Sequence, residues 1–272
     1  MRILIESEIM LAAVDVTWDA VHQNEAQSNM FALNALSSRA VQIAARGGFP
    51  DDIGVWHVPL RFTGNCASDM PFLDAEERAK ATRFRNTADQ VRFSLTRSVL
   101  RELLGVFWGI DPVQVKIRTT SRGKPELASS IRGRLLFNVS HSGAHALIAI
   151  SRKRVVGVDI ELVDKAIAWR ELATLVCTPG ERKMIEVSMP DTQHEEFYRC
   201  WTAKEALLKA LGLGITENLL ALTIDLRAVE RTSLSPQVAA EAHALDALRA
   251  MKCCWIRDIP DYSACLAYET DM

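Results

Sequence analysis

The segment at residues 156–161, Val-Gly-Val-Asp-Ile-Glu, alternates apolar and acidic residues toward its end. A β-strand period of two puts Val158 and Ile160 on one face of the strand and Asp159 and Glu161 on the other. Two carboxylates on one surface raise each other's pKa unless a cation or hydrogen-bond donors compensate them. The segment therefore predicts a strand with an apolar face and a cation site opposite, and Mg²⁺ is the hard cation that suits carboxylate oxygens.

The clearest helical pattern covers residues 195–211, with an apolar stripe and Gly212 as a stop signal. Glu205 and Lys209 lie one helical turn apart within it, in the run Trp-Thr-Ala-Lys-Glu-Ala-Leu-Leu-Lys-Ala. An ordinary surface ion pair, contributing about 0.3–0.5 kcal/mol, would also explain this spacing, and a solvated sheet edge would explain Asp159 and Glu161. Read together, the two segments place three carboxylates and two lysines where they suit a metal-bound phosphate ester.

The composition is that of an ordinary globular protein. Of the 272 residues, 49% are hydrophobic and 24% charged, which favours neither disorder nor a membrane class. The formal charge of −2 gives no global footprint for nucleic acid, so any anion site must be local. The six cysteines show no zinc-type spacing and are expected to be buried, reduced thiols. The N-terminus fits neither a secretory signal nor a spanning helix, so we expect a cytoplasmic protein without a membrane partner.

The order of the expected elements predicts an α/β fold of two similar halves that follow an N-terminal extension. We place the extension at residues 1–54, the N-terminal half at 55–152 and the C-terminal half, with the metal site, at 153–272. Residues 46–52, Arg-Gly-Gly-Phe-Pro-Asp-Asp, are typical of a linker, which would make the extension an appendage. Packing of the extension on the main domain is the alternative. No sequence repeat at a fixed period accompanies the two halves.

Short apolar runs predict the strands, and capping boxes predict the starts of two helices. The boxes lie at residues 87–90, Thr-Ala-Asp-Gln, and 178–181, Thr-Pro-Gly-Glu. The strands at 146–150 and 155–160 are expected to form a hairpin. The expected strands are 55–60, 113–117, 135–139, 146–150, 155–160, 222–226, 252–256 and 262–268.

Two further segments carry candidates for phosphate binding. Residues 137–143, Phe-Asn-Val-Ser-His-Ser-Gly, end an expected buried strand, where the hydroxyls of Ser140 and Ser142, the ring of His141 and backbone donors could hold a phosphate. A turn with an exposed histidine is the alternative, and a Ser–His nucleophile pair is disfavoured because adjacent residues on an extended backbone point apart. Residues 122–125, Arg-Gly-Lys-Pro, are either a turn with solvated cations or a phosphate clamp that uses Lys124.

In this order, the segments resemble the motifs of the 4′-phosphopantetheinyl transferases. The resemblance covers residues 56 to about 215 and is to the long, surfactin-synthetase type, which implies a monomer of two pseudo-symmetric α/β halves. The motifs that carry it are Trp56-x-x-Pro59-Leu60, Arg83-Phe84 with Arg92-Phe93, Gly123-Lys124-Pro125, Phe137-Asn138-x-Ser140-His141-Ser142, Gly157-x-Asp159-x-Glu161 and the run from Trp201 to Lys209.

The resemblance also implies roles for individual residues, by position in these motifs. The expected Mg²⁺ ligands are Asp159, Glu161 and Glu205. The expected coenzyme A contacts are Arg92, Lys124, Ser140, His141 and Lys209 and, more loosely, Arg78 and Lys80. The expected catalytic groups are Glu205, Lys209 and His141. Glu181 matches an additional acid near the metal in part of the family.

The implied reaction moves the 4′-phosphopantetheine arm of coenzyme A to a serine of an acyl or peptidyl carrier protein. This is the holo-[acyl-carrier-protein] synthase reaction, with Mg²⁺ as cofactor and 3′,5′-ADP as the product that leaves. Glu205 is the candidate for removing the serine proton, or it is a metal ligand only. A metal-dependent phosphate-ester hydrolase and a non-catalytic coenzyme A-binding regulator are the alternatives from other classes.

Overall fold

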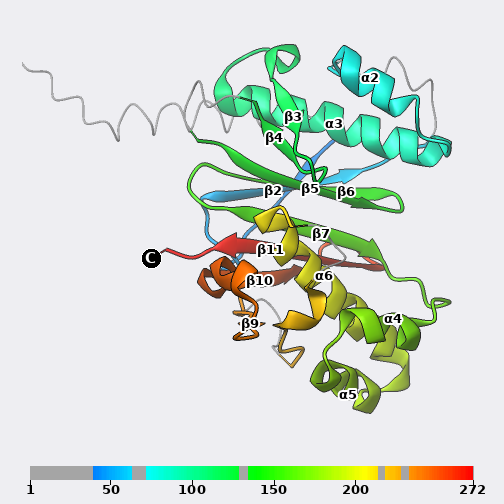
Figure 1. Cartoon of the computed structure of the whole chain (residues 1–272). Helices are drawn as coiled ribbons and strands as arrows, with labels where there is room; N and C mark the ends of the chain where they lie inside the picture. Colours follow the sequence, from blue (N-terminus) through cyan, green and yellow to red (C-terminus); the bar gives the residue numbers. More distant parts are fainter. Residues whose placement is uncertain (1–38, 63–71, 129–133, 214–217, 228–232, 272) are drawn as a thin grey trace, which may run out of the picture. The chain divides into compact units, whose positions relative to one another are not determined.

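The computed structural model describes residues 39–62, 72–128, 134–213, 218–227 and 233–271, all within the compact unit that runs from Ser37 to Met272 (Figure 1). The α-helices are α2 (Ala75–Ala81), α3 (Thr87–Trp108), α4 (Trp169–Val176), α5 (Pro179–Val187) and α6 (Gln193–Leu211). The strands are β1 (Val41–Ile43), β2 (Ile53–Pro59), β3 (Ile117–Thr119), β4 (Pro125–Leu127), β5 (Leu136–Ser142), β6 (His145–Ser151), β7 (Val156–Leu162), β8 (Leu222–Thr223), β9 (Gln237–Val238), β10 (Met251–Ile256) and β11 (Tyr262–Glu269). Short 3₁₀ helices cover Pro112–Gln114, Pro190–Thr192, Leu219–Ala221 and His243–Ala250. The predicted mixed α/β class is confirmed.

Two antiparallel sheets lie face to face, each with a long helix on its outer side (Figure 1). The first sheet has the order β1-β2-β6-β5 and is covered by α3; the second has the order β10-β11-β7 and is covered by α6. Apolar side chains of both sheets, among them Val55, Leu147, Val158 and Leu266, form one buried cluster between them. A second cluster joins α4, α5 and α6 to the outer face of β10 and β11. Burial on both faces is what makes the central strands rich in apolar residues.

The expected hairpin of β6 and β7 does not form. β6 pairs instead with β5 through the two-residue connection Gly143-Ala144, and β7 pairs with β11. Gly143 has a φ of +52°, the left-handed conformation that a tight hairpin turn of this length requires. Between β6 and β7 the side chain of Ser151 accepts hydrogen bonds from the amides of Lys153 and Arg154, and the chain leaves the first sheet for the second.

Two local predictions in the N-terminal half were also wrong. The alternating residues 113–117 do not form a strand: Pro112–Gln114 is a 3₁₀ helix whose first turn is capped by Asp111, and the strand β3 starts only at Ile117. The helix α3 is capped by Asn86, whose side chain accepts a hydrogen bond from Ala88, so Thr87 already lies inside the helix. The side chains of Asn and Asp accept hydrogen bonds from nearby backbone amides and so favour turns and helix starts. The alternation of apolar and polar residues does not indicate where this happens. The box at Thr178 and Glu181 is confirmed as the start of α5.

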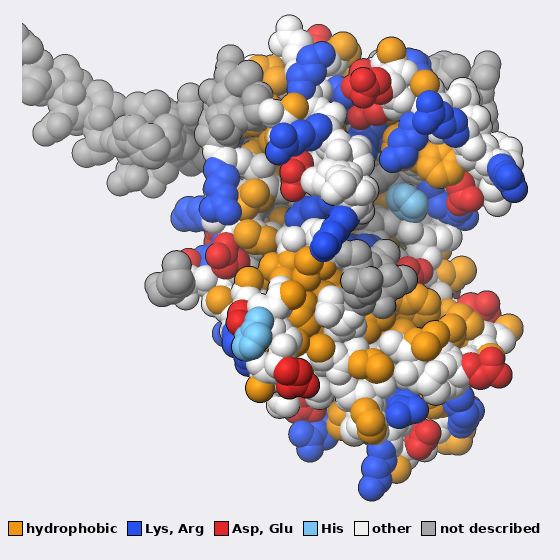
Figure 2. Space-filling view, in the orientation of Figure 1, with side chains coloured by type: hydrophobic (Ala, Val, Ile, Leu, Met, Phe, Trp, Pro, Cys, Tyr) orange, Lys and Arg blue, Asp and Glu red, His pale blue; other side chains and the backbone are white. Residues whose placement is uncertain are grey.

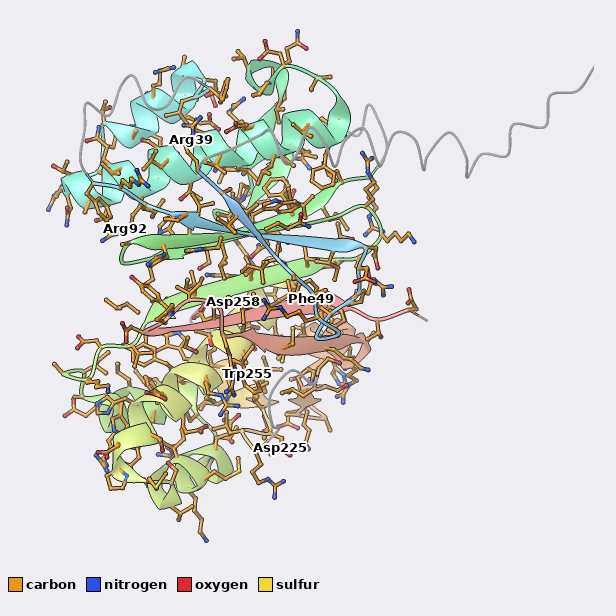
Figure 3. The ribbon with its side chains drawn as sticks, turned by 180° about the vertical axis from the view of Figure 1, so that it is seen from behind. Arg39, Phe49, Arg92, Asp225, Trp255 and Asp258 are labelled. Atoms are coloured by element: carbon orange, nitrogen blue, oxygen red, sulfur yellow. The ribbon has the colours of Figure 1, made fainter. Side chains whose placement is uncertain are left out.

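The expected end of the N-terminal extension, residue 54, is too late. β1 pairs with β2 from Val41 to Ile43, and Ile43, Phe49 and Ile53 are buried in the cluster between the sheets. Figure 3 shows Phe49 beside the second sheet. Phe49 lies within residues 46–52, the segment that was expected to be a linker. Residues 41–54 are therefore part of the folded unit. Residues 1–38 of the expected extension lie outside the described residues.

The thiols match the sequence prediction wherever the structure describes them. Cys177, Cys200, Cys253, Cys254 and Cys265 are free and buried, whereas Cys66 lies outside the described residues. In the part of the chain that the structure describes, no helix has the length and apolar character to cross a membrane.

Candidate functional site

The strand β7 divides its side chains as the sequence predicts. Val158 and Ile160 are buried between the two sheets, and Asp159 and Glu161 point to the other face, toward α6. Asp159 is completely buried, and Glu161 is half-buried. The acids that the sequence placed on one surface thus lie beneath the helix that carries Glu205 and Lys209.

Gly157 allows α6 to lie directly on β7. A Cβ atom at this position would be 2.0 Å from the carbonyl oxygen of Ala206 and 2.6 Å from the amide nitrogen of Ala210. No real Cβ tolerates such distances, so only glycine permits this approach of helix to strand. The close contact brings Glu205 and Lys209 of α6 next to the acids of β7.

Lys209 is the cation at the centre of the acidic group. Its Nζ donates a hydrogen bond to Ser140 Oγ at 2.9 Å and forms an ion pair with Asp159 Oδ1. Burial by itself would lower the pKa of Lys209, but the negative charges of Asp159, Glu205 and Glu161 more than offset this and raise it. Lys209 is therefore charged at every physiological pH and compensates one of three neighbouring carboxylates.

The other two carboxylates have strongly raised pKa values. Burial, followed by repulsion from Asp159, raises the pKa of both Glu161 and Glu205 to about 7. Ser142 Oγ donates to Glu161 at 2.8 Å and the indole nitrogen of Trp201 donates to Glu205 at 3.2 Å, which offsets only part of that cost. Near neutral pH the single ammonium of Lys209 therefore does not balance the three carboxylates of Asp159, Glu161 and Glu205.

Two buried carboxylate oxygens have no hydrogen-bond partner, Asp159 Oδ2 and Glu205 Oε2. A buried anionic oxygen without a donor is costly, and a divalent cation would satisfy both oxygens and the missing charge at once. Asp159, Glu161 and Glu205 therefore fit an oxygen-ligated cation in donor type, charge and unsatisfied oxygens. Their ligand atoms are not all within 4.8 Å of one another, as expected for like charges with only one lysine between them.

Side chains of β5 join the two sheets at the edge where β5 passes β7. Asn138 accepts a hydrogen bond from the amide of Val158 at 3.0 Å, Ser140 donates to Asp159 at 2.8 Å and Ser142 donates to Glu161. Alternate residues of a strand share a face, so Asn138, Ser140 and Ser142 all point to β7. Ser142 was expected only as one of several possible phosphate donors, but it contacts Glu161, as its spacing of two from Ser140 signals.

The remaining candidates of this region lie on β5, on α3 and beside the C-terminal end of α6. His141 is exposed, and partial loss of hydration followed by the charges of Lys209 and Arg92 lowers its pKa. Arg92 donates through Nε to the carbonyl of Gly143 at 2.7 Å and pairs with Asp89. Lys124 donates to the carbonyl of Ala210 at 2.8 Å, at the end of α6, and burial lowers its pKa. The structure thus gives both cations, Arg92 and Lys124, a protein partner.

A hollow of about 390 Å³ opens over this edge. Its lining includes Ser140, His141, Glu161, Lys209 and Lys80, so it brings five of the predicted residues together. A neighbouring hollow of about 840 Å³ shares Lys80, Phe84, Phe93 and Arg97 with it and extends along α2 and α3. On the face shown in Figure 2, Lys and Arg side chains gather over α2, α3 and the β3–β4 hairpin, above a hydrophobic band over α6.

Arg97 lines the two hollows but is not among the site residues expected from the sequence. Its side chain is 10% exposed, and its Nη1 is buried without a partner. Its guanidinium lies 5.7 Å from the centre of the Phe93 ring, and Lys80 lies 5.1 Å from the same ring. The signal was the helical spacing of Phe93 and Arg97, which puts them on one face of α3. Arg78 donates instead to the carbonyl of Leu73.

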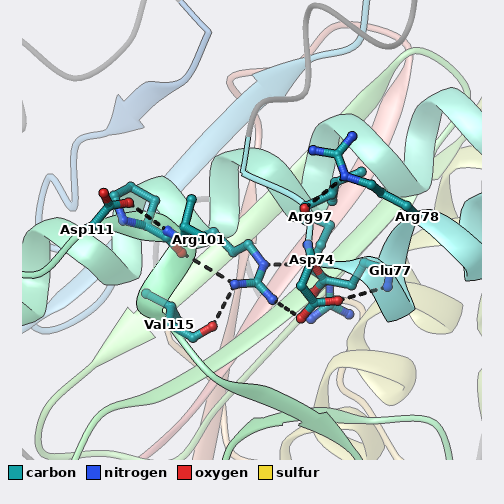
Figure 4. Close-up of polar contacts among 10 residues, drawn as sticks. Asp74, Glu77, Arg78, Arg97, Arg101, Asp111 and Val115 are labelled. Carbon is teal, nitrogen blue, oxygen red and sulfur yellow. Dashed lines mark hydrogen bonds and ion pairs between the residues drawn. The ribbon is translucent and has the colours of Figure 1, made fainter.

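A buried ion-pair network holds α2 against α3 and so fixes this groove wall (Figure 4). Arg101 is completely buried, donates to Glu77 at 2.7 Å and to the carbonyl of Val115 at 2.6 Å, and pairs with Asp74. Glu77 also closes the capping box of α2 with Asp74. Arg97 lies 3.5 Å from the second oxygen of Glu77, which orients its guanidinium along the wall.

Glu181 does not lie with the metal candidates. Its carboxylate is fully buried and forms an ion pair of 2.6 Å with Lys204, which also donates to the carbonyls of Val176 and Leu219. The second oxygen of Glu181 accepts a hydrogen bond from Ile224 at 2.7 Å. Cys177 and Cys200 are close enough to Glu181 to resemble a metal cluster among the described residues, but the Lys204 ammonium already occupies its carboxylate. The role implied for Glu181 near the metal is therefore wrong, and the residue stabilises the core.

Comparisons with known proteins identify the family of the chain. The profile of the 4′-phosphopantetheinyl transferase superfamily matches residues 155–265, and that of the N-terminal region of 4′-phosphopantetheinyl transferases matches residues 64–153. The chain is 38% identical over 170 residues to the 4′-phosphopantetheinyl transferase HetI of Nostoc sp., which covers 61% of this chain and 71% of HetI. It is 35% identical over 161 residues to a putative 4′-phosphopantetheinyl transferase of Synechocystis sp., covering 57% of this chain and 65% of that protein. A 4′-phosphopantetheinyl transferase of Bacillus subtilis is 28% identical over 158 residues, covering 58% and 68%.

The chain belongs to the 4′-phosphopantetheinyl transferase superfamily. The finer prediction of the surfactin-synthetase type stays a prediction, because the matched families and relatives give the superfamily and not the type.

Proposed function

We propose that this protein transfers the 4′-phosphopantetheine arm of coenzyme A to a serine of an acyl or peptidyl carrier protein. The serine oxygen forms a new bond to the pantetheine-side phosphorus, the bond from that phosphorus to the bridging pyrophosphate oxygen breaks, and 3′,5′-ADP leaves. The observation that carries the proposal is the buried group of Asp159, Glu205 and Lys209, in which two carboxylate oxygens have no partner. Such a group suits a cation and a pyrophosphate better than it suits a closed protein core.

Each residue has a task in this reaction. Asp159, Glu161 and Glu205 would hold Mg²⁺, which supplies charge neutralisation at the pyrophosphate when bound. Lys209 places its ammonium beside the same oxygens and stabilises charge that develops in the transition state. Glu205 is also the candidate for taking the serine proton, directly or through water. Its pKa of about 7 is that of the metal-free site, and a bound cation would lower it.

The two adjoining hollows, which share Lys80, Phe84, Phe93 and Arg97, form one groove, and we propose that coenzyme A binds in it. His141, Ser140, Lys80 and Arg97 line it, and so do Gly123 and Pro125, the neighbours of Lys124 in the chain. Arg92 bonds to the turn that follows His141. The phosphates of coenzyme A are anions that charge-assisted hydrogen bonds from such groups recognise. Arg78, bonded to the carbonyl of Leu73, is the weakest member of this set.

Mass spectrometry of a carrier domain tests the proposal directly. The protein, Mg²⁺ and coenzyme A are incubated with an acyl or peptidyl carrier domain and, separately, with the same domain in which the acceptor serine is alanine. We expect one phosphopantetheine to be added to the first domain and none to the second. Release of free phosphopantetheine without any carrier would identify a hydrolase, and binding of coenzyme A without chemistry would identify a regulator.

The location and assembly of the protein also follow from the proposal. Five buried free thiols suit a reducing compartment, and the carrier proteins of the proposed reaction would have to be reached there, so we propose a cytoplasmic enzyme. We further propose that it acts as a monomer, since the acids, Lys209 and the groove all come from one chain. Sedimentation of the active protein tests this.

The raised pKa values predict how pH controls cation binding. Between about pH 4.5 and 7, Glu161 and Glu205 hold protons in the folded protein that the unfolded chain has already released, so metal-free stability falls as pH rises through this window. A divalent cation requires the ionised carboxylates. The increase in melting temperature on adding Mg²⁺ is therefore expected to be larger at about pH 8 than at about pH 6.

The matched control for this pH effect is the double variant Glu161→Gln with Glu205→Gln, in which neither group titrates. Its melting temperature should respond weakly to Mg²⁺ at both pH values. An equal Mg²⁺-induced shift at the two pH values in the unaltered protein would contradict the cation site.

Arg97 is predicted to contribute to coenzyme A affinity. Arg97→Gln keeps a polar side chain but removes a charge whose buried Nη1 has no protein partner. Loss of one charge-assisted contact, worth about 1.5–3 kcal/mol, should raise the dissociation constant of coenzyme A about 10- to 150-fold. Calorimetry measures it, with Arg227→Gln as the control because Arg227 is exposed and paired with Asp225. Equal coenzyme A affinity of both variants would show that Arg97 does not contribute to binding.

A further inference from the structure

The turn between β5 and β6 connects three elements of the site. Its first residue, Ser142, donates to Glu161 and accepts a hydrogen bond from the amide of Leu162 at 3.2 Å, both on β7. The carbonyl of Gly143 accepts the hydrogen bond from Arg92 of α3. His141 immediately precedes the turn. The position of the turn therefore sets where His141 and Arg92 stand relative to the metal-binding strand.

Tyr262 reaches this turn from the C-terminal half. It is the first residue of β11, where it pairs with Leu162, and its hydroxyl oxygen accepts a hydrogen bond from the amide of Ala144 at 3.0 Å. The same hydroxyl fills the space beside Gly143, because a Cβ atom there would lie 2.3 Å from it. The carbonyl of Ala144 is held separately, by the amide of Leu60 in the N-terminal half. Tyr262 is thus the contact of the turn with β11.

Two histidine rings support the ring of Tyr262. The ring of His145 meets it edge-on at a centroid distance of 4.6 Å and stacks on the ring of His57 at 4.8 Å. His57 Nε2 and His145 Nδ1 are 2.6 Å apart, a hydrogen bond that needs at least one neutral ring. Burial lowers the pKa of both histidines, which favours the neutral forms. These contacts hold the Tyr262 hydroxyl against the turn.

We propose that Tyr262 is a positioning residue that fixes the β5–β6 turn, and through it Arg92 and His141, for binding the phosphates of coenzyme A. The inference rests on the proposed function, because it assigns Tyr262 to the coenzyme A side of that site. Among the described residues, Tyr262 contacts the turn. It makes no hydrogen bond to the three acids or to Lys209 there. Its loss should therefore weaken coenzyme A binding more than it slows the chemical step.

The variant Tyr262→Phe tests this with the smallest possible change, removal of one hydroxyl. We expect the KM for coenzyme A to rise about 2- to 10-fold, the range for one hydrogen bond, while kcat and the melting temperature change little. Hydrogen exchange at the amide of Ala144 should accelerate. Tyr268→Phe is the matched control, since Tyr268 lies at the other end of β11 with its hydroxyl bonded to Ser233. The KM for coenzyme A, kcat and the exchange at Ala144 should stay unchanged in this control.

A double-mutant cycle tests the geometry independently. Gly143→Ala alone pushes a methyl group into the Tyr262 hydroxyl and should raise the KM for coenzyme A more than Tyr262→Phe does. Combined with Tyr262→Phe, the nearest ring carbon would be 3.2 Å away, so the double variant should lose less than the product of the two single effects. Multiplicative losses, or a Tyr262→Phe variant that behaves like Tyr268→Phe, would overturn the proposal. If the unaltered protein transfers no phosphopantetheine while Ala144 exchange still accelerates in Tyr262→Phe, the proposed function fails and the contact stands.

Discussion

Replacing Asp159 by asparagine is expected to lower transfer to a carrier protein on the order of 10³-fold while leaving the fold intact. Asp159 is completely buried, pairs with Lys209 and supplies one of the two unpartnered oxygens. The amide has the same size but no charge, so it cannot both compensate Lys209 and hold a cation. Its removal also ends the repulsion that helps to raise the pKa of Glu161 and Glu205, which should preserve stability.

Single-turnover transfer and thermal melts separate these two effects. The control is Asp246→Asn, in which an exposed carboxylate that pairs with Arg249 is changed in the same way. Its transfer rate should equal that of the unaltered protein. If Asp159→Asn retained a rate within about tenfold of normal at limiting Mg²⁺, the metal site on β7 would be wrong.

The parts of the site that follow a regular backbone could be predicted from the sequence. Alternation along β7 separated Asp159 and Glu161 from Val158 and Ile160, and helical spacing placed Glu205 and Lys209 one turn apart. Both periods are properties of the backbone and do not depend on what packs against it. The starts and ends of elements were less predictable, because Asn86 and Asp111 compete for backbone amides over one or two residues.

The parts that depend on contacts between distant segments could not be predicted. Alternation identifies β6 and β7 as strands but says nothing about their partners, and the glycine turn after Ser142 favoured the pair β5–β6 instead. The position of Glu181 depended on Lys204, which lies 23 residues away and buries its charge in the core. The resemblance implied that Glu181 lies near the metal, because a sequence motif does not show which cation a carboxylate pairs with in the folded protein.

Gly157→Ala is expected to damage both stability and transfer, because the glycine is what lets α6 touch β7. The new Cβ would meet the backbone of α6 at Ala206 and Ala210, which cannot move aside as a flexible side chain could. The helix must therefore shift, and overpacking of this kind costs about 1–3 kcal/mol or more. Glu205 and Lys209 shift with it, and a displacement of about 1 Å in a catalytic constellation can cost on the order of 10²-fold in rate.

Gly180→Ala is the matched control, since it makes the same substitution in the first turn of α5, where nothing lies within 4 Å of the added Cβ. Alanine there should leave transfer unchanged and raise stability by about 0.4–1 kcal/mol, because it reduces the conformational freedom of the unfolded chain. The two variants thus predict opposite signs in a chemical denaturation experiment. A Gly157→Ala protein with normal stability and normal transfer would contradict this prediction. It would show that the site does not depend on the close contact of α6 with β7 at Gly157.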